Sequence, residues 1–510
     1  MVNASRPSMC CVTSTKALGR TSSKGEVILS KSPILQINPD RLFPVEPSVR
    51  RLCGELYEQV RAAPIISPHG HTDPAWFACD TPFDNALSLL VTPDHYLLRM
   101  LYSRGVALED LGVPDRQGSV VVSPREGWRN FARRYYLFTG TPSKVWLDTT
   151  FAEVFGLTVQ LDEHSADLYF DHINECLSQE AFRPRQLLDR FNVAFIATTE
   201  HALDPLLHHQ ALVEQGLSTR VTTTFRPDDV LDPDFDGFAE NVERLGEVTG
   251  ETVASYSGYL NALRARRAAF RAVGATATDH GPVSPFTACL ADDEAGRLYG
   301  RCLSGAASGD ERKLFRGHML IEMARMSLDD GMVMQLHPGS SRNHNSALFN
   351  RFGPDKGADI PRRVDYCEAL KPLLNAVGNE PDLELIVFTL DESNYARELA
   401  PLAGHYPALR LGPPWWFNDS PEGMLRFRHS VTETAGFYNT AGFNDDTRAL
   451  LSIPARHDMA RRMDARFLAQ LVTEGRLSEA EALRLITTLT TDLVVEAYRL
   501  GDRVERFTAA

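Results

Sequence analysis

The stretch Pro64-Ile65-Ile66-Ser67-Pro68-His69-Gly70-His71-Thr72-Asp73-Pro74 joins a short apolar strand to a loop bounded by prolines. Side chains two residues apart on a strand lie on the same face. His69 and His71 can therefore point both imidazole rings into one cavity at the carboxyl end of the strand. A His-x-His pair alone is more often fortuitous. The pattern therefore predicts two ligands of a divalent metal only if other residues complete the site.

Further apolar runs follow this strand, and most of them end in polar residues. We expect strands at 191–201, 221–228, 275–281, 332–339, 383–390 and 438–446. Helical patterns separate them, for example at 313–328, and another helix over 47–63 precedes the first strand. This alternation predicts a parallel sheet, and polar residues at the ends of many successive strands favour a closed barrel over an open sheet. The expected fold class is α/β, a (β/α)₈ TIM-like barrel.

The length of 510 residues agrees with one large unit, because barrels of this kind can exceed about 400 residues when they carry insertions. The region of about 81–186 has mostly helical patterns and predicts an insertion over the barrel mouth. We expect residues 29–510 to form a single barrel domain with this insertion. Residues 1–28 are rich in Ser and Thr and predict a disordered tail; a transit peptide and a later start at Met9 are the alternatives.

Composition excludes several classes of function. A net charge of −14 argues against a nucleic-acid partner, and an anionic substrate would need its own local arginines. No apolar run approaches the roughly 18 residues of a membrane span. The eight cysteines are scattered without Cys-x-x-Cys spacing, so neither a zinc knuckle nor a disulfide framework is indicated. We expect a soluble, cytoplasmic protein without a nucleic-acid or membrane partner, and a homo-oligomer remains open.

Asp446 lies at the end of the last predicted strand. The first and last strands of a barrel are neighbours, so this carboxylate can approach His69 and His71. Two imidazoles and a carboxylate form an open zinc or manganese site that leaves positions for substrate oxygens or water. The alternative role for an aspartate at a strand end is a helix N-cap.

Two other segments carry candidate ligand contacts. His337 ends the strand at 332–339 and precedes Arg342 and Asn345 in a loop rich in hydrogen-bond donors. Arg342 can bind a carboxylate through two hydrogen bonds, and the asparagine can bind hydroxyl groups. Trp415 and Trp416 place two large rings beside polar groups, where they either fill the barrel mouth or stack on a sugar. A solvated loop and core packing are the alternatives for these two segments.

Taken together, these motifs resemble the uronate isomerase (glucuronate isomerase) family of the amidohydrolase superfamily, over about 42–462. The matching motifs are the His-Gly-His of the first strand, Asp94-His95-Tyr96 with Arg99, Gln335-Leu336-His337 with Arg342-Asn343, Trp415-Trp416-Phe417-Asn418-Asp419, Asp446-Thr447-Arg448, and Arg456-His457-Asp458. The chain departs from the family pattern at His344 and at Glu200-His201.

The resemblance implies an aldose–ketose isomerase of hexuronate catabolism that interconverts D-glucuronate with D-fructuronate and D-galacturonate with D-tagaturonate. It implies a divalent metal, expected to be zinc and not necessarily essential for turnover, on His69, His71 and Asp446. The substrate would be a small anionic sugar, and its site would be lined by the side chains of His95, Tyr96, His337 and Arg448.

Proton transfer through a cis-enediol needs a carboxylate near C2 and a group that can donate a proton to the carbonyl oxygen. We assign Asp446 as the base and Tyr96 as a candidate acid. Arg448 and Arg342 would hold the sugar carboxylate or stabilise the enediolate, while the metal or the two histidines orient hydroxyls. A hydride shift is the alternative route for the hydrogen.

Two other functions remain as alternatives at this point. One is a metal-dependent hydrolase acting on a small polar substrate, although no predicted strand end offers the lysine that a binuclear site of that type would need. The other is a sugar-binding module without turnover.

Overall fold

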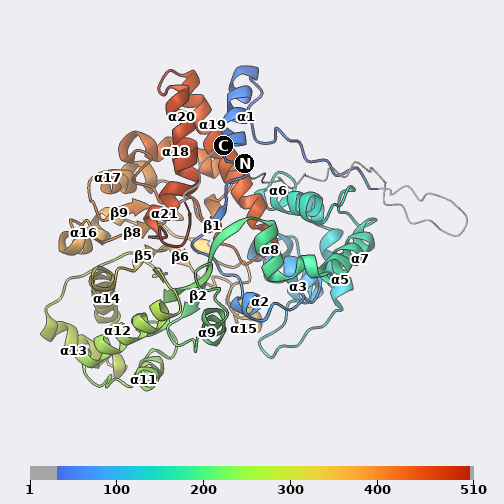
Figure 1. The fold of residues 1–510 in the computed structure, drawn as a ribbon. Helices are drawn as coiled ribbons and strands as arrows, with labels where there is room; N and C mark the ends of the chain where they lie inside the picture. The colour runs from blue at the N-terminus through green and yellow to red at the C-terminus, as the bar shows by residue number, and fades with distance from the viewer. Residues whose placement is uncertain (1–31, 506–510) are drawn as a thin grey trace, which may run out of the picture.

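The centre of the molecule is a curved parallel sheet. The computed structural model describes residues 32–505, so the expectation for residues 1–28 lies outside the described residues. Within that range the sheet contains β1 (Ile65–Ser67), β2 (Val193–His201), β3 (Val221–Arg226), β4 (Ala277–His280), β5 (Val333–Leu336), β8 (Leu385–Val387) and β9 (Leu409–Leu411). Each strand pairs in parallel with the next one of this series (Figure 1). The separate hairpin of β6 (Ser340–Ser341) and β7 (Ile360–Pro361) is antiparallel.

An extended segment takes the eighth position and closes the ring. On one side the Leu411 N–H donates to the Asn439 carbonyl and the Ala441 N–H donates to the Leu411 carbonyl, both at 2.9 Å. On the other side the His71 N–H donates to the Thr447 carbonyl at 3.0 Å. The segment 439–447 therefore joins β9 to the stretch that follows β1, and the predicted barrel is confirmed.

Two details of the strand prediction are wrong. The segment at 438–446 is not a regular strand, because φ angles of +75° at Gly442 and +38° at Asp446 interrupt the extended backbone. The strand β9 is absent from the prediction, because it is only three residues long and lies directly before Gly412-Pro413-Pro414. A strand this short has no alternation that a sequence pattern could reveal.

Helices surround the sheet between successive strands, and the predicted helix at 313–328 lies inside the longest of them. A capping box of Ser308 and Glu311 begins that helix. The helices of this part are α9 (Leu207–Glu214), α10 (Asp228–Leu231), α11 (Phe238–Thr249), α12 (Tyr256–Ala272), α13 (Asp292–Leu303), α14 (Gly309–Asp330), α15 (Ser346–Phe352), α16 (Tyr366–Val377), α17 (Ala400–Ala403) and α18 (Pro421–Ala435).

The chain between β1 and β2 is mainly helical, and its apolar side chains form a buried cluster that also includes residues of β2, α15 and α19 (Ile453–Thr473). Its helices are α2 (Pro74–Cys79), α3 (Ala86–Leu90), α4 (His95–Tyr102), α5 (Pro124–Ala132), α6 (Pro142–Thr149), α7 (Ala166–Leu177) and α8 (Pro184–Arg190). Trp128, Phe131 and Phe151 are fully buried in this core. The helix α4 is the part of this region that carries candidate site residues.

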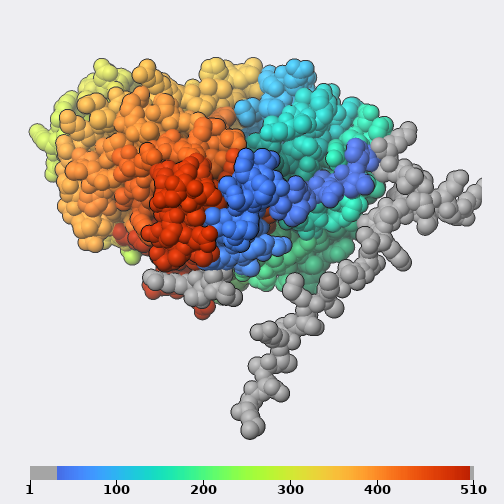
Figure 2. Space-filling view, turned by 90° about the horizontal axis from the view of Figure 1, so that it is seen from above, coloured from blue at the N-terminus to red at the C-terminus, as the bar shows by residue number. Residues whose placement is uncertain are grey.

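The two ends of the described chain pack together. α1 (Pro47–Val60) lies against α19 (Ile453–Thr473) and α20 (Glu479–Thr487). Figure 2 shows the blue N-terminal segment between the orange and red C-terminal helices and the cyan helical region. None of the helices in the range 32–505 is long and apolar enough to cross a membrane.

The last helix, α21 (Leu493–Ala497), closes the barrel at the amino ends of its strands. Val494, Ala497 and Tyr498 belong to the same buried cluster as Ile66 and the other apolar side chains inside the barrel. Arg499 donates to the backbone carbonyls of Gly331 and Asp382, which precede β5 and β8. The opposite end of the barrel, where the strands terminate, is therefore the end left for a site.

We expect Gly442→Ala to destabilise the protein by about 1–3 kcal/mol, the usual cost of overpacking a filled core. A Cβ at Gly442 would collide with the side chain of Val494 and lie 3.2 Å from its backbone nitrogen. Gly475→Ala is the control, because Gly475 has a similar φ of +71° but open space around it. Thermal melting of both variants measures the difference; equal melting temperatures would contradict close packing of α21 against the eighth segment.

Candidate active site

Two histidines and an aspartate meet at the carboxyl end of the barrel. The Nε2 atom of His71 lies 3.2 Å from Asp446 Oδ1, and the Nε2 atom of His69 lies 3.5 Å from the same oxygen. Oδ1 is buried, yet its contacts with the two rings lack the alignment of hydrogen bonds. The two rings are 5.3 Å apart and nearly perpendicular, so their nitrogens converge on one carboxylate oxygen.

The backbone explains this convergence. The bond from the His71 N–H to the Thr447 carbonyl fixes the two segments side by side, and the left-handed φ of +38° at Asp446 turns its side chain away from the direction that a regular strand would give it. Behind the cluster, the hydroxyl of Tyr498 donates to Gln335 at 3.0 Å, and the carboxamide of Gln335 reaches within 3.5 Å of His69 Nδ1.

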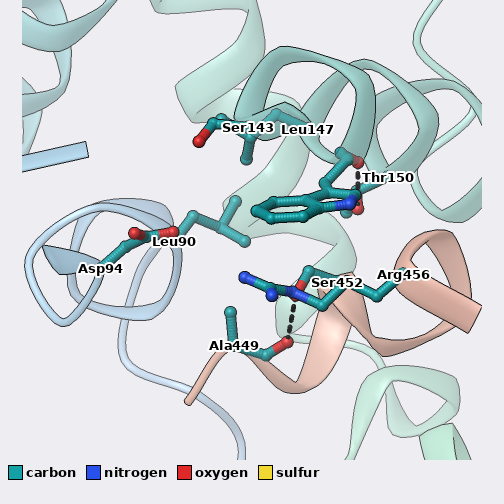
Figure 3. Close-up of a pocket in the computed structure, with 9 residues that line it drawn as sticks. Leu90, Asp94, Ser143, Leu147, Thr150, Ala449, Ser452 and Arg456 are labelled. Carbon is teal, nitrogen blue, oxygen red and sulfur yellow. Dashed lines mark hydrogen bonds between the residues drawn. The ribbon is translucent and has the colours of Figure 1, made fainter. Parts of the chain in front are cut away.

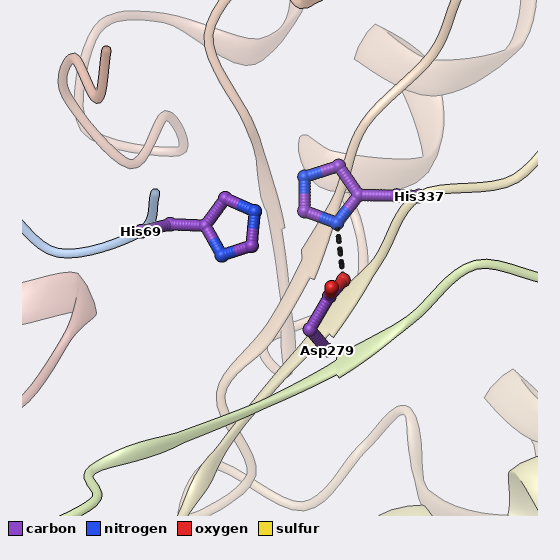
Figure 4. Close-up of side chains that lie close together, drawn as sticks. All are labelled: His69, Asp279 and His337. Atoms are coloured by element: carbon purple, nitrogen blue, oxygen red, sulfur yellow. Dashed lines mark hydrogen bonds and ion pairs between the residues drawn. The ribbon is translucent and has the colours of Figure 1, made fainter. Parts of the chain in front are cut away.

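A second group of potential ligands shares His69 with the first. It consists of His69, Asp279 at the end of β4 and His337 just after β5 (Figure 4). His337 Nδ1 and Asp279 Oδ1 are 2.7 Å apart, and the other oxygen of Asp279 lies 3.1 Å from Arg226. The ring of His337 stacks on His69 at 4.8 Å, while its Nε2 atom is buried without a hydrogen-bond partner.

The electrostatics of the cluster favour neutral imidazole beside ionised carboxylate. Burial lowers the pKa of His69 to about 4, so this ring is neutral at pH 7. Burial alone would raise the pKa of Asp446, but the neighbouring His69 and His71 hold it well below its usual range. Arg226 and His337 likewise overcome burial and keep the pKa of Asp279 well below its usual range. These are the protonation states that metal coordination requires.

A wall of aromatic rings faces the cluster from α4 and from the segment after β9. Asp94 caps α4 by accepting from the Tyr96 and Leu97 N–H groups, which places His95 and Tyr96 in the first turn. His95 stacks on Tyr96 at 4.7 Å and lies 5.1 Å from Trp416. Burial lowers the pKa of His95 to about 3, and its Nε2 atom is buried without a hydrogen-bond partner. Trp415 lies on the other side, 4.7 Å from the ring of His337.

The hydroxyl of Tyr96 belongs to a buried polar network. It donates to Asp419 Oδ2 at 2.9 Å, and Arg456 donates to the same oxygen at 2.9 Å. Burial raises the pKa of Tyr96 well above 10 and that of Asp419 to about 7. Tyr96 is therefore a hydrogen-bond donor whose partner can itself exchange a proton near neutral pH.

A small cavity lies behind this network. Its volume is about 10 Å³, and Figure 3 shows Asp94, Leu147 and Arg456 among the side chains around it. This volume is at the lower limit for one water molecule. Arg456 also lies over the ring of Trp146, 3.7 Å from its centroid. The cavity is too small for a sugar, and its lining includes Asp94, the residue that caps α4.

The two candidate arginines reach the mouth from different segments and meet at one carboxylate. Arg448 donates to Asp355 Oδ2 at 2.9 Å, and Arg342 lies 3.9 Å from the other oxygen of Asp355. Arg342 also lies 3.5 Å from Asp359 and over the ring of Trp416. The Oδ1 atom of Asn345 accepts from the Leu348 N–H and caps α15, and its contact with a ligand stays a prediction.

The structure also brings together residues that sequence reasoning did not select for the site. They are Arg226, Asp279, Asp355, Asp419 and Arg456. Arg226 and Asp279 end predicted strands, so their position was a usable signal, whereas Asp355 lies in a loop where no pattern distinguishes it from other surface acids. Glu200 is directed elsewhere: it accepts from Thr198 and Thr223 and lies 3.5 Å from His209 of α9.

A closed parallel barrel whose first strand ends in two histidines and whose eighth segment supplies an aspartate defines a barrel enzyme of the amidohydrolase superfamily. A family model described as glucuronate isomerase matches residues 49–498. The chain belongs to the glucuronate isomerase family.

Individual relatives agree over nearly the whole chain. A uronate isomerase from Rhizorhabdus wittichii is 61% identical over 466 residues, which cover 91% of this chain and 99% of the relative. The crystal structure of glucuronate isomerase from Caulobacter crescentus has a TM-score of 0.91 and 54% identity, covering 94% of this chain and 100% of that one. A uronate isomerase structure from Thermotoga maritima has a TM-score of 0.84 and 27% identity, covering 91% of this chain and 99% of that one.

We expect Glu200→Gln to stabilise the protein relative to wild type, increasingly so as pH rises from about 4.5 to 7. Burial raises the pKa of Glu200 to about 7, so the folded state binds a proton that the unfolded state has released in this interval. Wild-type stability therefore falls across the interval, by up to roughly 3 kcal/mol, and the amide lacks this loss. Melting temperatures across this pH range measure it; a constant difference between the two proteins would contradict a raised pKa.

Proposed function

We propose that the chain is a uronate isomerase that interconverts D-glucuronate with D-fructuronate and D-galacturonate with D-tagaturonate. The observation that carries the proposal is the ionised Asp446 carboxylate between two histidines, with Arg448 two residues further along the chain and Arg342 meeting Arg448 at Asp355. This arrangement offers a base for a C–H proton and cations for a sugar carboxylate at the same end of the barrel. Family membership supports the same activity and removes the motive for the hydrolase alternative.

In the proposed reaction, Asp446 takes the proton from C2 of the open-chain aldose and returns it to C1. Both contacts of this carboxylate with the histidines are made by Oδ1, which leaves Oδ2 for the substrate. The low pKa of Asp446 keeps the base ionised at neutral pH. The intermediate is an enediolate, and the guanidinium group of Arg448, two residues away, can stabilise its negative charge.

We assign Tyr96 to the carbonyl oxygen of the sugar. Its pKa well above 10 suits hydrogen-bond donation better than complete loss of the proton. Asp419, which accepts the Tyr96 hydroxyl and has a pKa of about 7, can supply and take back the proton through Tyr96. His95, His337, Trp415 and Trp416 would shape the walls that bind the sugar ring and hydroxyls.

The donor set fits a divalent cation. Ligand atoms about 2.0–2.1 Å from a shared ion at tetrahedral angles are roughly 3.3 Å apart, near the 3.2 and 3.5 Å separations of this cluster. We infer that His69, His71 and Asp446 hold the ion, and that zinc suits this mixture of imidazole and carboxylate. When bound, such an ion supplies positive charge that polarises a sugar oxygen.

The proposed substrate is a small sugar acid. We also infer a cytoplasmic location, because Cys79, Cys289 and Cys367 are free and exposed, and a reducing compartment keeps such thiols reduced. The side-chain oxygen of Asn345 caps α15, so its amide nitrogen is the group that would donate to the substrate.

We expect Asp446→Asn to lower kcat by at least about 10³-fold while the fold is kept, since the amide cannot accept the C2 proton. ¹H NMR with D-glucuronate and with D-galacturonate in D₂O follows ketose formation and deuterium entry. Asp445→Asn is the matched control, because the neighbouring Asp445 binds His457 instead of the cluster; it should retain activity per folded molecule. Near-normal turnover by Asp446→Asn would remove this residue as the base, and ketose without deuterium would favour hydride transfer.

Metal analysis tests the second part of the proposal. We expect about one zinc per chain in purified wild-type protein and a loss of most of it in His71→Asn, because two ligands hold an ion much less tightly than three. His208→Asn is the control, since His208 lies on α9 away from the cluster. Equal metal content in the two variants would place the ion elsewhere.

A further inference from the structure

The carboxylate of Asp355 lies where the two arginines would receive a substrate carboxylate. Its contacts with Arg448 at 2.9 Å and Arg342 at 3.9 Å use both of its oxygens, one for each arginine. Burial alone would raise the pKa of Asp355, but the two arginines outweigh this effect and hold the pKa well below its usual range. The Asp355 carboxylate is therefore an anion. A carboxylate bridging two guanidinium groups is the same chemistry by which they would bind a uronate.

The loop is anchored on the far side of Asp355, whereas Asp355 itself is partly exposed. Asp359 is 3% exposed and accepts from the Asn343 N–H at 2.6 Å. Gly357 has a φ of +77°, and a Cβ there would lie 2.7 Å from the His95 carbonyl, so this point of the loop touches the backbone of α4 directly. Asp355 lies between these anchors and α15. Its side chain is 28% exposed, and its backbone is left-handed with a φ of +61°.

We propose that Asp355 is an internal stand-in for the substrate carboxylate, which a uronate must displace from Arg448 and Arg342. The inference rests on the proposed function of the two arginines. It makes Asp355 a determinant of affinity and specificity: a sugar gains the arginine contacts only if its own anion replaces the anion already there. A neutral sugar leaves the Asp355 ion pairs in place.

The test compares Asp355→Asn with Asp359→Asn, two carboxylate-to-amide changes in the same loop. Asp355→Asn removes the competitor, so we expect KM for D-glucuronate to fall about two- to fivefold with kcat unchanged, the range set by partly exposed ion pairs. Asp359→Asn removes the anchor of Arg342 and should raise KM. Inhibition by the neutral D-glucuronamide should be the same in wild type and Asp355→Asn.

Other results would overturn the inference. If Asp355 orients Arg448 throughout the reaction, its amide variant will lose kcat/KM, as Asp359→Asn does. If it is only structural, the melting temperature will fall and KM will stay constant. Wild-type activity tests the proposed function separately from the role of Asp355, because failure of wild type to turn over either uronate would reject the proposed function. In that case, calorimetry would compare the binding of D-glucuronate to wild type and to Asp355→Asn. Equal or weaker binding by Asp355→Asn would reject the role of Asp355.

Discussion

The contact between the His71 N–H and the Thr447 carbonyl is the constraint on which the site depends. It joins two segments that are far apart in sequence and have no regular ladder between them. Through it, the histidines that follow β1 meet the Asp446 carboxylate of the eighth segment. The packing of α21 and Tyr498 against the inside of the barrel supports the same junction from below, since Tyr498 accepts from Asn444 and donates to Gln335.

Buried charge is balanced locally throughout the site. Arg226 compensates Asp279 and Asp228, and Arg456 compensates Asp419. Such pairs are costly to bury, and they hold their charge only where geometry gives each group a partner. The protein as a whole carries a net charge of −14, so attraction for a sugar anion would have to come from local arginines such as Arg448 and Arg342. A site with paired arginines avoids leaving unpaired positive charge at the mouth before the substrate arrives.

Much of the fold was predictable because the barrel repeats one pattern, with apolar strands that end in polar residues. The strands β1, β4 and β5 follow it, and His69, Asp279 and His337 lie at or just after their carboxyl ends. The pattern failed at β9 and at 438–446, where a strand is three residues long or positive φ angles replace it. Pairings such as Tyr96 with Asp419 could not be predicted, since they join segments whose relative position depends on the packing of α4. Asp355 is the extreme case, because only the path of its loop brings it to the arginines.

In the proposed reaction, Asp446 has two tasks that oppose each other. A cation on Asp446 would withdraw electron density from the oxygen pair that must accept the C2 proton, and a stronger base would bind the cation more tightly. The arrangement of the two oxygens eases this conflict, because Oδ1 faces both histidines while Oδ2 is outside their contacts. Isomerisation needs no activated water, so an ion that orients and polarises sugar oxygens would be sufficient. On the same scaffold a hydrolase has to generate hydroxide, which demands a more complete metal centre.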